Sequence, residues 1–339
     1  MKKWITDIIQ AEDAGATYKA KNDIANFAEE IGLRKLSIFR YDSAHERSEE
    51  IHSRIDGITA PVKRGDIVYY QFPTYNGVRF EQFFIEHMDV RGAKMVAIVH
   101  DIEFLRFPSN TKFDEIKYLN RFSVVIVHNK FMAEVLKNSG LNTSIISLDI
   151  FDYAVNDKIL DREEITKQVI IAGSLDKSLY LKKWDYETPV IAYGLQPSFQ
   201  LGPSVKYMGA LAPESVAQNL PAGFGLAWDT NTNAYENSEN YAKYNNPHKV
   251  SLYLASGLPV IVKKNTAIAN IVVTYNLGII IDSLEDLDTS LSQIDEKQMR
   301  SMLISVNNFR KLLSDGYYTK RAIAMAEFQV VMGFSDKEI

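Results

Sequence analysis

The feature that most constrains the fold is an alternation of short apolar runs with longer amphipathic stretches. In the first half, the apolar runs lie at residues 4–8, 36–40, 67–72, 95–99, 124–127 and 144–147, and helical patterns lie at 18–31, 77–91, 114–120 and 130–138. This order is typical of β-α-β units, whose parallel strands are buried on both faces and are therefore apolar throughout. The first half thus predicts a parallel sheet flanked by helices.

The second half repeats this arrangement. Strands are expected at residues 169–172, 190–193, 207–208, 225–228, 260–262 and 278–281, and helices at 216–219, 249–255, 267–275, 284–294, 297–313 and 317–332. A stretch rich in Asp and Asn, residues 151–161, separates the halves and indicates a linker. We therefore expect an α/β protein with two Rossmann-like domains, residues 1–155 and 156–316, followed by a C-terminal helix in 317–339.

Composition excludes several classes of protein. The 339 residues suffice for two domains, and 46% of them are hydrophobic, which indicates well-formed cores. The net charge of -5 gives no reason to expect a nucleic acid partner. There is no cysteine, so no thiolate metal site can form, and no run is long enough to span a membrane. Too few apolar residues follow the initial Met-Lys-Lys for a signal peptide, so we expect a cytoplasmic protein.

Ligands of parallel α/β sheets bind beyond the carboxyl ends of the strands, so the residues after each strand are the candidates for a site. After the first strand, residues 10–17 are small and polar and include Asp13, Gly15 and Thr17, the last a candidate helix N-cap. They contain no G-x-G-x-x-G dinucleotide motif, which argues against an NAD enzyme. After the third strand, residues 71–77 (Gln-Phe-Pro-Thr-Tyr-Asn-Gly) suit either contact with a sugar acceptor or a rigid turn.

The fourth strand is followed by the densest cluster of ionisable residues at a strand end. His100, Asp101, Glu103 and Arg106 lie within seven positions. A histidine, two carboxylates and an arginine are the groups needed for acid–base chemistry beside a developing charge. The alternative is a set of charged residues at the rim of the sheet.

Strand ends in the second half carry groups suited to phosphate. Gly173 and Ser174 can present backbone N–H groups, and Lys177 can supply positive charge. Tyr193 ends the next strand. Asp229 follows the fourth strand, where it is suited equally to sugar hydroxyls and to capping a helix. Residues 231–240 form a long polar loop, either a lid or a disordered segment.

Residues 244–262 predict a loop, a helix, a tight turn and a buried strand. Asn246 and Pro247 favour a helix start, and Gly257 is placed to end the helix in a left-handed conformation. His248 and Lys249 lie in the first turn, where the helix dipole disfavours a cation unless an anion is bound. A bound diphosphate would explain both residues, and a surface lysine beside a capped helix is the alternative. On this basis Lys249→Ala is expected to leave the fold intact or slightly more stable.

This helix start, Asn-Pro-His-Lys leading to Ala-Ser-Gly-Leu-Pro-Val-Ile, is similar to the donor-binding helix of GT-B glycosyltransferases. The chain more closely resembles the glucosyltransferase 3-like family. The segments that carry the resemblance, besides residues 246–261, are 4–7 (Trp-Ile-Thr-Asp), 71–73 (Gln-Phe-Pro), 100–106 (His-Asp-Ile-Glu-Phe-Leu-Arg), 172–175 (Ala-Gly-Ser-Leu) and 223–229 (Gly-Phe-Gly-Leu-Ala-Trp-Asp). Their order along the chain matters more than any one of them.

The resemblance implies a GT-B fold, with two domains facing across a cleft and a C-terminal helix that crosses back to the first domain. It implies a UDP-sugar donor, with glucose as the sugar, and a glycan acceptor such as a GlcNAc-modified serine-rich bacterial adhesin. The residues expected at the donor are Gly15, Thr17, Gly173, Ser174, Lys177, Tyr193, Asp229, Asn246, His248 and Lys249. The candidates for the base are Asp101 first, then Glu103, Asp13 and His100, with inversion at the sugar carbon.

Neither a cofactor nor a metal ion is expected. An Asp-x-Asp pattern occurs at Asp286 and Asp288, but it falls at a predicted helix start and not at a strand end. Lysine and a helix dipole can take the place of a metal ion at the leaving group. We expect a homo-oligomer, a dimer or a tetramer.

Three alternatives stay open. One is a transferase that uses UDP-GlcNAc or UDP-galactofuranose for surface polysaccharide. The second is a catalytically silent subunit that stabilises an active partner, although the retained donor residues argue against it. The third is a nucleotide-sugar epimerase on the same two-domain plan, which would change the sugar of its donor without any acceptor.

Overall fold

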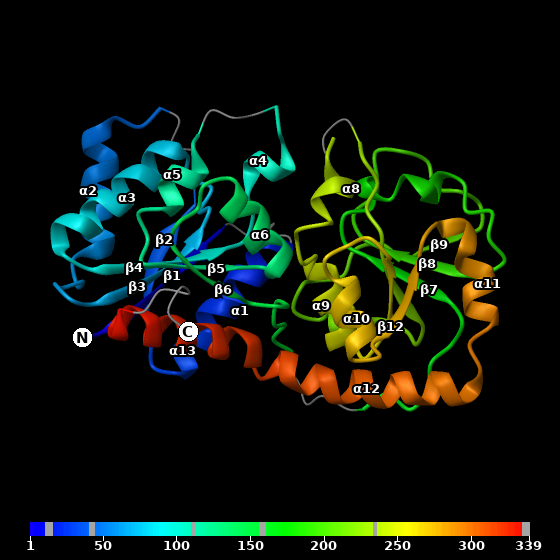
Figure 1. The fold of residues 1–339 in the computed structure, drawn as a ribbon. Helices are drawn as coiled ribbons and strands as arrows, with labels where there is room; N and C mark the ends of the chain where they lie inside the picture. The colour runs from blue at the N-terminus through cyan, green and yellow to red at the C-terminus, as the bar shows by residue number, and fades with distance from the viewer. Residues whose placement is uncertain (11–15, 41–44, 110–112, 156–160, 233–235, 334–339) are drawn as a thin grey trace. The chain divides into compact units, whose positions relative to one another are not determined.

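The computed structural model divides the chain into two compact units, Met1–Asp149 with Gly316–Ile339, and Ile150–Asp315 (Figure 1). It describes residues 1–10, 16–40, 45–109, 113–155, 161–232 and 236–333. Each unit contains one sheet of six parallel strands with helices packed against it. The α/β class predicted from the alternating pattern is therefore confirmed.

The first unit contains the strands predicted in the first half. They are β1 (Lys3–Ile9), β2 (Arg34–Phe39), β3 (Ile67–Phe72), β4 (Lys94–Val99), β5 (Val124–Val127) and β6 (Ser144–Ser147), and their order in the sheet is β2-β1-β3-β4-β5-β6. Every residue of β3 and β5 is buried, as expected of central strands that are covered on both faces.

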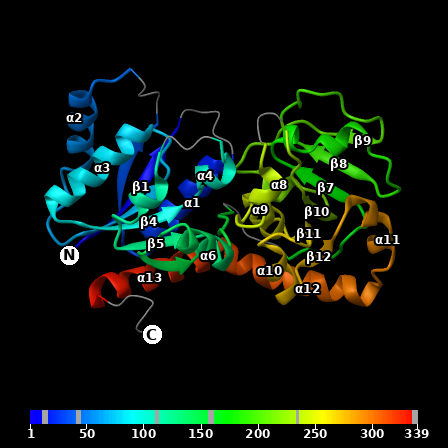
Figure 2. The same ribbon diagram turned by 45° about the horizontal axis from the view of Figure 1, so that its top comes forward.

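The helices of this unit are α1 (Ala16–Glu30), α2 (Ser48–Thr59), α3 (Val78–Arg91), α4 (Glu103–Arg106), α5 (Glu115–Leu119), α6 (Lys130–Asn138) and α13 (Tyr317–Met332). Helices α2 and α3 lie on one side of the sheet, and α1 and α13 lie on the other (Figure 2). The sequence analysis did not predict α2 or α4. Helix α2 buries only Ile51, Ile55 and Thr59, a narrow stripe among charged residues, and α4 has a single turn.

The C-terminal helix α13 belongs to the first unit, as the family resemblance implied. It packs against α1, β5 and β6. The Tyr69 hydroxyl donates a hydrogen bond to the carbonyl of Ile323 at 3.1 Å, and the Arg321 guanidinium lies 2.7 Å from the Asp149 carboxylate. The last helix of the chain therefore completes the first core.

The second unit follows the same plan. Its strands are β7 (Val169–Ala172), β8 (Val190–Tyr193), β9 (Val205–Tyr207), β10 (Phe224–Ala227), β11 (Val260–Lys263) and β12 (Gly278–Ile281), in the order β12-β11-β10-β7-β8-β9. Its helices are η1 (Leu175–Lys177), η2 (Leu179–Lys182), α7 (Val216–Asn219), α8 (Ser238–Tyr241), α9 (His248–Ala255), α10 (Ala269–Thr274), η3 (Leu284–Asp286), α11 (Leu287–Ser292) and α12 (Glu296–Ser314). The predicted loop 231–240 thus overlaps α8, and its residues 233–235 lie outside the described residues.

Strand order locates the functional edge of each sheet. In the first unit the direction of chain progression reverses between β1 and β3, and in the second unit it reverses between β7 and β10. Loops that leave the sheet in opposite directions open a crevice at such a switch point, and ligands of α/β proteins bind there. The relevant loops are those after β1, β3, β7 and β10.

Helix α9 packs closely on the switch point of the second sheet because a glycine lies beneath it. A Cβ added at Gly225 would lie 2.1 Å from the Tyr253 ring. The backbone N–H of Ala172, at the end of β7, donates to the Tyr253 hydroxyl at 2.8 Å, and the carbonyl of Leu226 lies 3.3 Å from that hydroxyl. Tyr253 therefore fixes α9 against β7 and β10 together.

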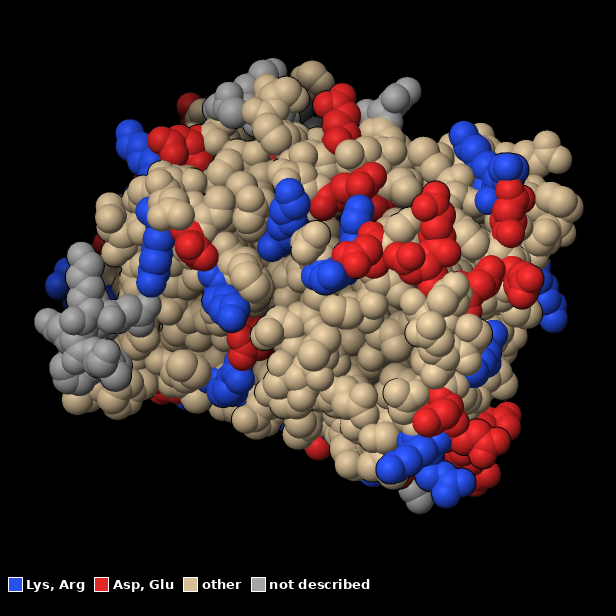
Figure 3. Space-filling view, turned by 45° about the vertical axis from the view of Figure 1, so that its right-hand side comes forward, with Lys and Arg blue, Asp and Glu red and all other residues tan. Residues whose placement is uncertain are grey.

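On the face drawn in Figure 3, acidic and basic side chains are interspersed, so this face does not present the basic patch that a polyanion would bind. Within the described residues, none of the helices combines the length and the hydrophobicity that a membrane span requires.

Gly225→Ala is expected to lower the free energy of unfolding by about 1–3 kcal/mol, because the new methyl group overlaps the Tyr253 ring. Urea denaturation measures the change. Gly57→Ala is the matched control: a Cβ at Gly57 in α2 meets no atom within 4 Å, so alanine should stabilise the helix by about 0.5–1 kcal/mol. Equal stability of Gly225→Ala and wild type would contradict the packing described here.

Candidate functional site

In the second unit, the loops after β7 and β8 touch through their backbones. The N–H of Gly173 donates to the carbonyl of Tyr193 at 3.0 Å. A Cβ on Gly194 would lie 2.2 Å from the carbonyl oxygen of Gly173, so a glycine is required there. Gly173 itself has a φ of +123°, which an L side chain rarely adopts. These glycines give the loop after β7 the open backbone expected of a phosphate contact, and Tyr193 is buried beside it.

The main charged feature at this switch point is an ion pair between Lys249 and Asp229. The Lys249 ammonium lies 2.5 Å from the Asp229 carboxylate, and the two side chains are 16% and 24% exposed. Lys177, in η1, is close enough for its charge to lower the pKa of Asp229 further. Three predicted residues from three segments are therefore gathered at the carboxyl ends of β7 and β10.

Mutual attraction within the pair exceeds the cost of burial. Burial acts to raise the pKa of Asp229, but the charges of Lys249 and Lys177 outweigh it, and the pKa falls below its ordinary value. Burial acts to lower the pKa of Lys249, but Asp229 outweighs it, and that pKa rises above its ordinary value. Both residues are therefore charged at neutral pH.

The start of α9 differs from the prediction. The helix begins at His248 with Pro247 in the N-cap position, so Asn246 precedes the helix instead of capping it. Proline has no side-chain acceptor, so the N-cap residue leaves the N–H groups of the first turn to other partners. Gly257 ends the helix with a φ of +75°, as predicted. Asn246 is buried, and the His248 ring packs 5.1 Å from the ring of Tyr153.

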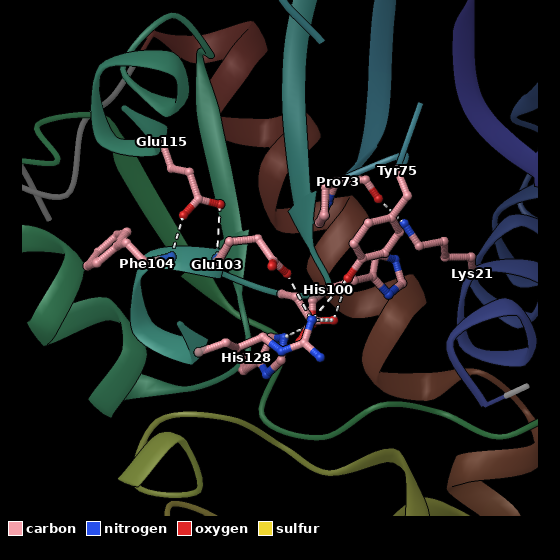
Figure 4. A network of polar contacts seen from close by, with 10 residues as sticks. Lys21, Pro73, Tyr75, His100, Glu103, Phe104, Glu115 and His128 are labelled. Carbon is pink, nitrogen blue, oxygen red and sulfur yellow. Dashed lines mark hydrogen bonds and ion pairs between the residues drawn. The ribbon is translucent and has the colours of Figure 1, made fainter. Parts of the chain in front are cut away.

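In the first unit, Asp101 lies in a polar network at the ends of β3 and β4. Figure 4 shows this network, with Tyr75 and Glu103 among its labelled members. Its Oδ2 accepts a hydrogen bond from the Tyr75 hydroxyl at 2.8 Å and lies 3.2 Å from the Arg106 guanidinium. Arg106 also pairs with Glu103 at 2.8 Å. Burial raises the pKa of Glu103 more than Arg106 lowers it. Asp101, Glu103 and Arg106 are thus brought together as predicted.

His100 takes a different place from the other members of its cluster. It is buried, and its Nε2 lies 2.8 Å from Oε1 of Gln71, whose amide nitrogen donates to the carbonyls of Thr6 and Lys21. Its own carbonyl accepts from Nε2 of His128 at 3.0 Å, and burial lowers the pKa of His128 to about 4. His100 therefore links the ends of neighbouring strands beneath the site.

Two buried glutamates that the sequence analysis did not single out hold the loops of this network. Glu115 accepts hydrogen bonds from the backbone N–H groups of Glu103 at 3.1 Å and Phe104 at 2.8 Å, and burial raises its pKa to about 7 (Figure 4). Glu81 accepts from both the N–H and the hydroxyl of Thr74 at 2.8 Å. Burial raises the pKa of Glu81 as well.

Lys21 was also missed, because it lies in a helix and not at a strand end. It is 2% exposed, and its ammonium donates to the carbonyl of Pro73 across the switch point between β1 and β3. Burial lowers its pKa to about 8 against the opposing charges of Glu81 and Asp101. Apolar spacing gives no warning of a charged residue on the buried face of a helix, so only the fold reveals this contact.

Some predictions concern residues that the structure does not describe. Asp13 and Gly15 lie outside the described residues.

Thr17 lies within α1, which begins at Ala16, so its expected N-cap position is wrong. Asp286 and Asp288 both bind backbone N–H groups: Asp286 that of Ser283, and Asp288 those of residues 187 and 188.

Comparison with known proteins decides the family. The N-terminal domain of the glucosyltransferase 3-like family matches residues 2–150, and its C-terminal domain matches residues 169–326. The chain belongs to the glucosyltransferase 3-like family. It is 31% identical to Glucosyltransferase 3 of Streptococcus gordonii over 335 residues, which are 98% of this chain and 100% of that protein. A β-1,6-galactofuranosyltransferase of Escherichia coli K12 is 32% identical over 57% of this chain and 59% of its own.

Solved structures agree on the fold of this glucosyltransferase 3-like chain. An alpha-glucosyltransferase in complex with UDP superposes with a TM-score of 0.62 at 11% sequence identity, covering 96% of this chain and all of the other. A trehalose-phosphate synthase from Burkholderia xenovorans superposes with a TM-score of 0.53 over 85% of this chain and 79% of its own. The fold is therefore GT-B, and the chain is a glycosyltransferase of its family.

Because of the ion pair, we expect the loss of the Lys249 charge to destabilise the fold, whereas the helix dipole alone predicts unchanged or slightly higher stability. Lys249→Met leaves the partly buried Asp229 carboxylate without its main partner, and we expect a loss of about 1–3 kcal/mol, between the values for exposed and fully buried pairs. Asp229→Asn should cost a similar amount, and the double variant should recover most of the loss. Urea denaturation of the four proteins measures this, and single variants as stable as wild type would disprove it.

The contribution of the Lys249–Asp229 ion pair to the free energy of unfolding depends on pH through the pKa shifts of the two residues. The pKa of Asp229 is below its ordinary 3.8, so the contribution is complete above pH 3.8 and is lost as the pH falls through the folded-state value. The pKa of Lys249 is above its ordinary 10.5, so the contribution is complete below pH 10.5 and is lost at higher pH. Free energies of unfolding measured at pH 7 therefore include the full contribution of the Lys249–Asp229 ion pair.

Proposed function

We propose that this protein transfers glucose from UDP-glucose to a hydroxyl group of a glycan. The observation that carries the proposal is the set of Lys249, Asp229 and Lys177 at the switch point of the second sheet. Two lysines beside the loop that carries Gly173 and beside a helix start suit a diphosphate, and the family relatives include a glucosyltransferase. The superposed alpha-glucosyltransferase carries UDP, which supports the same donor class here.

The second unit is assigned the donor. Lys249 and Lys177 stabilise the diphosphate, the N–H groups of Gly173 and Ser174 contact its oxygens, and Tyr193 contacts the nucleotide. Asn246 and His248 shape the helix start, and Asp229 meets a sugar hydroxyl once a diphosphate draws Lys249 away. Negative charge grows on the leaving UDP as the glycosidic bond breaks, so the lysine contacts strengthen in the transition state.

The first unit is assigned the acceptor. The acceptor hydroxyl passes its proton to the Asp101 carboxylate while its oxygen forms a bond to the anomeric carbon. The bond from that carbon to UDP breaks, and its electron pair stays on the β-phosphate oxygen. A single displacement of this kind inverts the anomeric centre. Glu103 is the second candidate base, because burial raises the pKa of its carboxyl group.

For the acceptor, we propose a GlcNAc-modified serine-rich protein, modified in the cytoplasm by a homo-oligomeric enzyme. The similarity to a galactofuranosyltransferase makes UDP-galactofuranose the second donor to test. Incubation with donor alone separates the remaining classes: an epimerase changes the sugar without acceptor, and a silent subunit neither changes nor transfers it.

Lys249→Met is expected to weaken UDP binding by about 10- to 100-fold, because a hydrogen bond to a charged group contributes about 1.5–3 kcal/mol. Asp229→Asn is the matched control, because it breaks the same ion pair but leaves the cation for the diphosphate, so its affinity should equal or exceed that of wild type. Calorimetry with UDP measures both. If both variants lose affinity equally, the pair is structural and the donor contacts lie elsewhere.

Transfer is expected to be independent of divalent metal ions, since lysines take the role of a cation at the leaving diphosphate. Turnover of UDP-glucose with a GlcNAc-serine peptide should be the same in EDTA and in buffer with manganese. Loss of turnover in EDTA that manganese restores would refute this mechanism.

A further inference from the structure

Tyr75 has an unusual backbone conformation within the network around Asp101. Its φ is +62°, in the left-handed region that bulky residues rarely occupy. Backbone outliers of this kind persist only where the surroundings fix them, and they cluster at functional sites. The loop after β3 that carries Tyr75 lies at the switch point of the first sheet.

Buried charged groups fix the loop just before Tyr75. The Glu81 carboxylate accepts two hydrogen bonds from Thr74, and the Lys21 ammonium donates to the carbonyl of Pro73. Lys21 and Glu81 are only 2% and 3% exposed. The backbone conformation of Tyr75 is therefore imposed by side chains of α1 and α3.

The ring and the hydroxyl of Tyr75 have charged neighbours (Figure 4). The Lys21 ammonium and the Arg40 guanidinium lie 5.2 Å and 4.9 Å from the ring centroid, within the range of cation–π contacts. The hydroxyl donates to Oδ2 of Asp101 at 2.8 Å and accepts from Arg106 at 3.2 Å. Tyr75 thus joins the loop after β3 to the loop after β4.

The direction of the contact with Asp101 is fixed by chemistry. Burial, together with the charge of Asp101, raises the pKa of the Tyr75 phenol far above its ordinary value, so the phenol keeps its proton at every working pH. It therefore donates, and a carboxylate is the better acceptor than a carboxylic acid. The Arg106 guanidinium pairs with Glu103 as well as with Asp101, whereas the Tyr75 hydroxyl donates its hydrogen bond to Asp101.

We propose that Tyr75 is the positioning residue of the base: its phenol holds the Asp101 carboxylate in one orientation and in its ionised form. This rests on the proposed function, in which Asp101 takes the acceptor proton. A carboxylate turned away from the acceptor, or protonated at the working pH, cannot do so. The buried contacts of Lys21 and Glu81 act on Asp101 through Tyr75.

Two consequences are expected for Tyr75→Phe, which keeps the ring and its cation contacts but removes the donor. Turnover should fall by about 10- to 100-fold, the scale of a misplaced catalytic group, with little change in KM for UDP-glucose. The acid limb of the pH profile of kcat/KM should move to higher pH by about 0.5–1 pH unit, because the carboxylate of the base loses the hydrogen bond that Tyr75 donates to it.

Other charged groups face Asp101 and could contribute to that limb. They are Glu103 and Arg106 on α4, Glu115 on α5, Lys21 on α1 and His128 after β5. Arg40 after β2 faces the Tyr75 ring, and Glu81 on α3 faces Lys21. Glu115, with a pKa of about 7, titrates closest to the working pH. A second comparison therefore uses Glu115→Gln alone and Glu115→Gln combined with Tyr75→Phe. The acid limb of the pH profile should shift between these two proteins as it does between wild type and Tyr75→Phe.

The experiment measures transfer from UDP-glucose to a GlcNAc-serine peptide between pH 5 and 9, with the urea denaturation midpoint of each variant as a check on the fold. Asp101→Asn comes first: a fall of about 100- to 10,000-fold supports the base assignment, and near-wild-type turnover overturns it and the inference with it. Tyr69→Phe is the matched control, because it loses a hydrogen bond to the carbonyl of Ile323 and not to Asp101. Its pH profile should equal that of wild type.

Given an inactive Asp101→Asn, Tyr75→Phe decides the inference alone. Lower turnover with a shifted limb supports it. Wild-type turnover, or lower turnover with an unshifted limb, overturns it while the base assignment stands. If Tyr75→Phe does not fold, 3-fluorotyrosine at position 75, a stronger donor, should move the limb to lower pH, and an unmoved limb overturns the inference.

Discussion

Parallel pairing of the strands is the constraint on which the rest of this structure depends. Because the strands of each sheet point the same way, every loop that leaves a carboxyl end meets the others at one edge, and strand order selects the crevice within that edge. Polar groups gathered there are largely out of water and need partners. The contacts of Lys249 with Asp229 and of Asp101 with Tyr75 and Arg106 are two solutions to this requirement, one in each unit.

Buried charged side chains on the helices of the first unit act as internal anchors for its loops. Glu81 and Glu115 each bind two donors of a strand-end loop, and Lys21 binds the carbonyl of Pro73. Such contacts are costly, because burial opposes the charge of each group, as the pKa directions of Lys21, Glu81 and Glu115 show. They fix the loop backbones with more precision than apolar packing, which tolerates repacking.

Most of the fold could be predicted from the sequence, because buried parallel strands such as β3 and β7 are apolar throughout and the helices between them are amphipathic. Lys249, Asp229 and Lys177 could be named because they follow strands. Their pairing could not be predicted, since it depends on how close α9 packs to β10, which Gly225 decides. The sequence does not predict α2, because its apolar stripe is narrow. It also does not predict the burial of Lys21, Glu81 and Glu115, because a charged side chain within a helix is expected to face solvent.

The Lys249–Asp229 pair also bears on how quickly an enzyme of this kind can turn over. Without a counter-ion in the empty donor site, the lysine would bind the UDP product as tightly as it binds the UDP-sugar donor. Under the proposed function, the Asp229 carboxylate competes with the diphosphate for the Lys249 ammonium and pairs with it again when the diphosphate leaves. Under the proposed function, each cycle exchanges one anion for another at the same cation, so the enzyme gives up some donor affinity and is less inhibited by its own product.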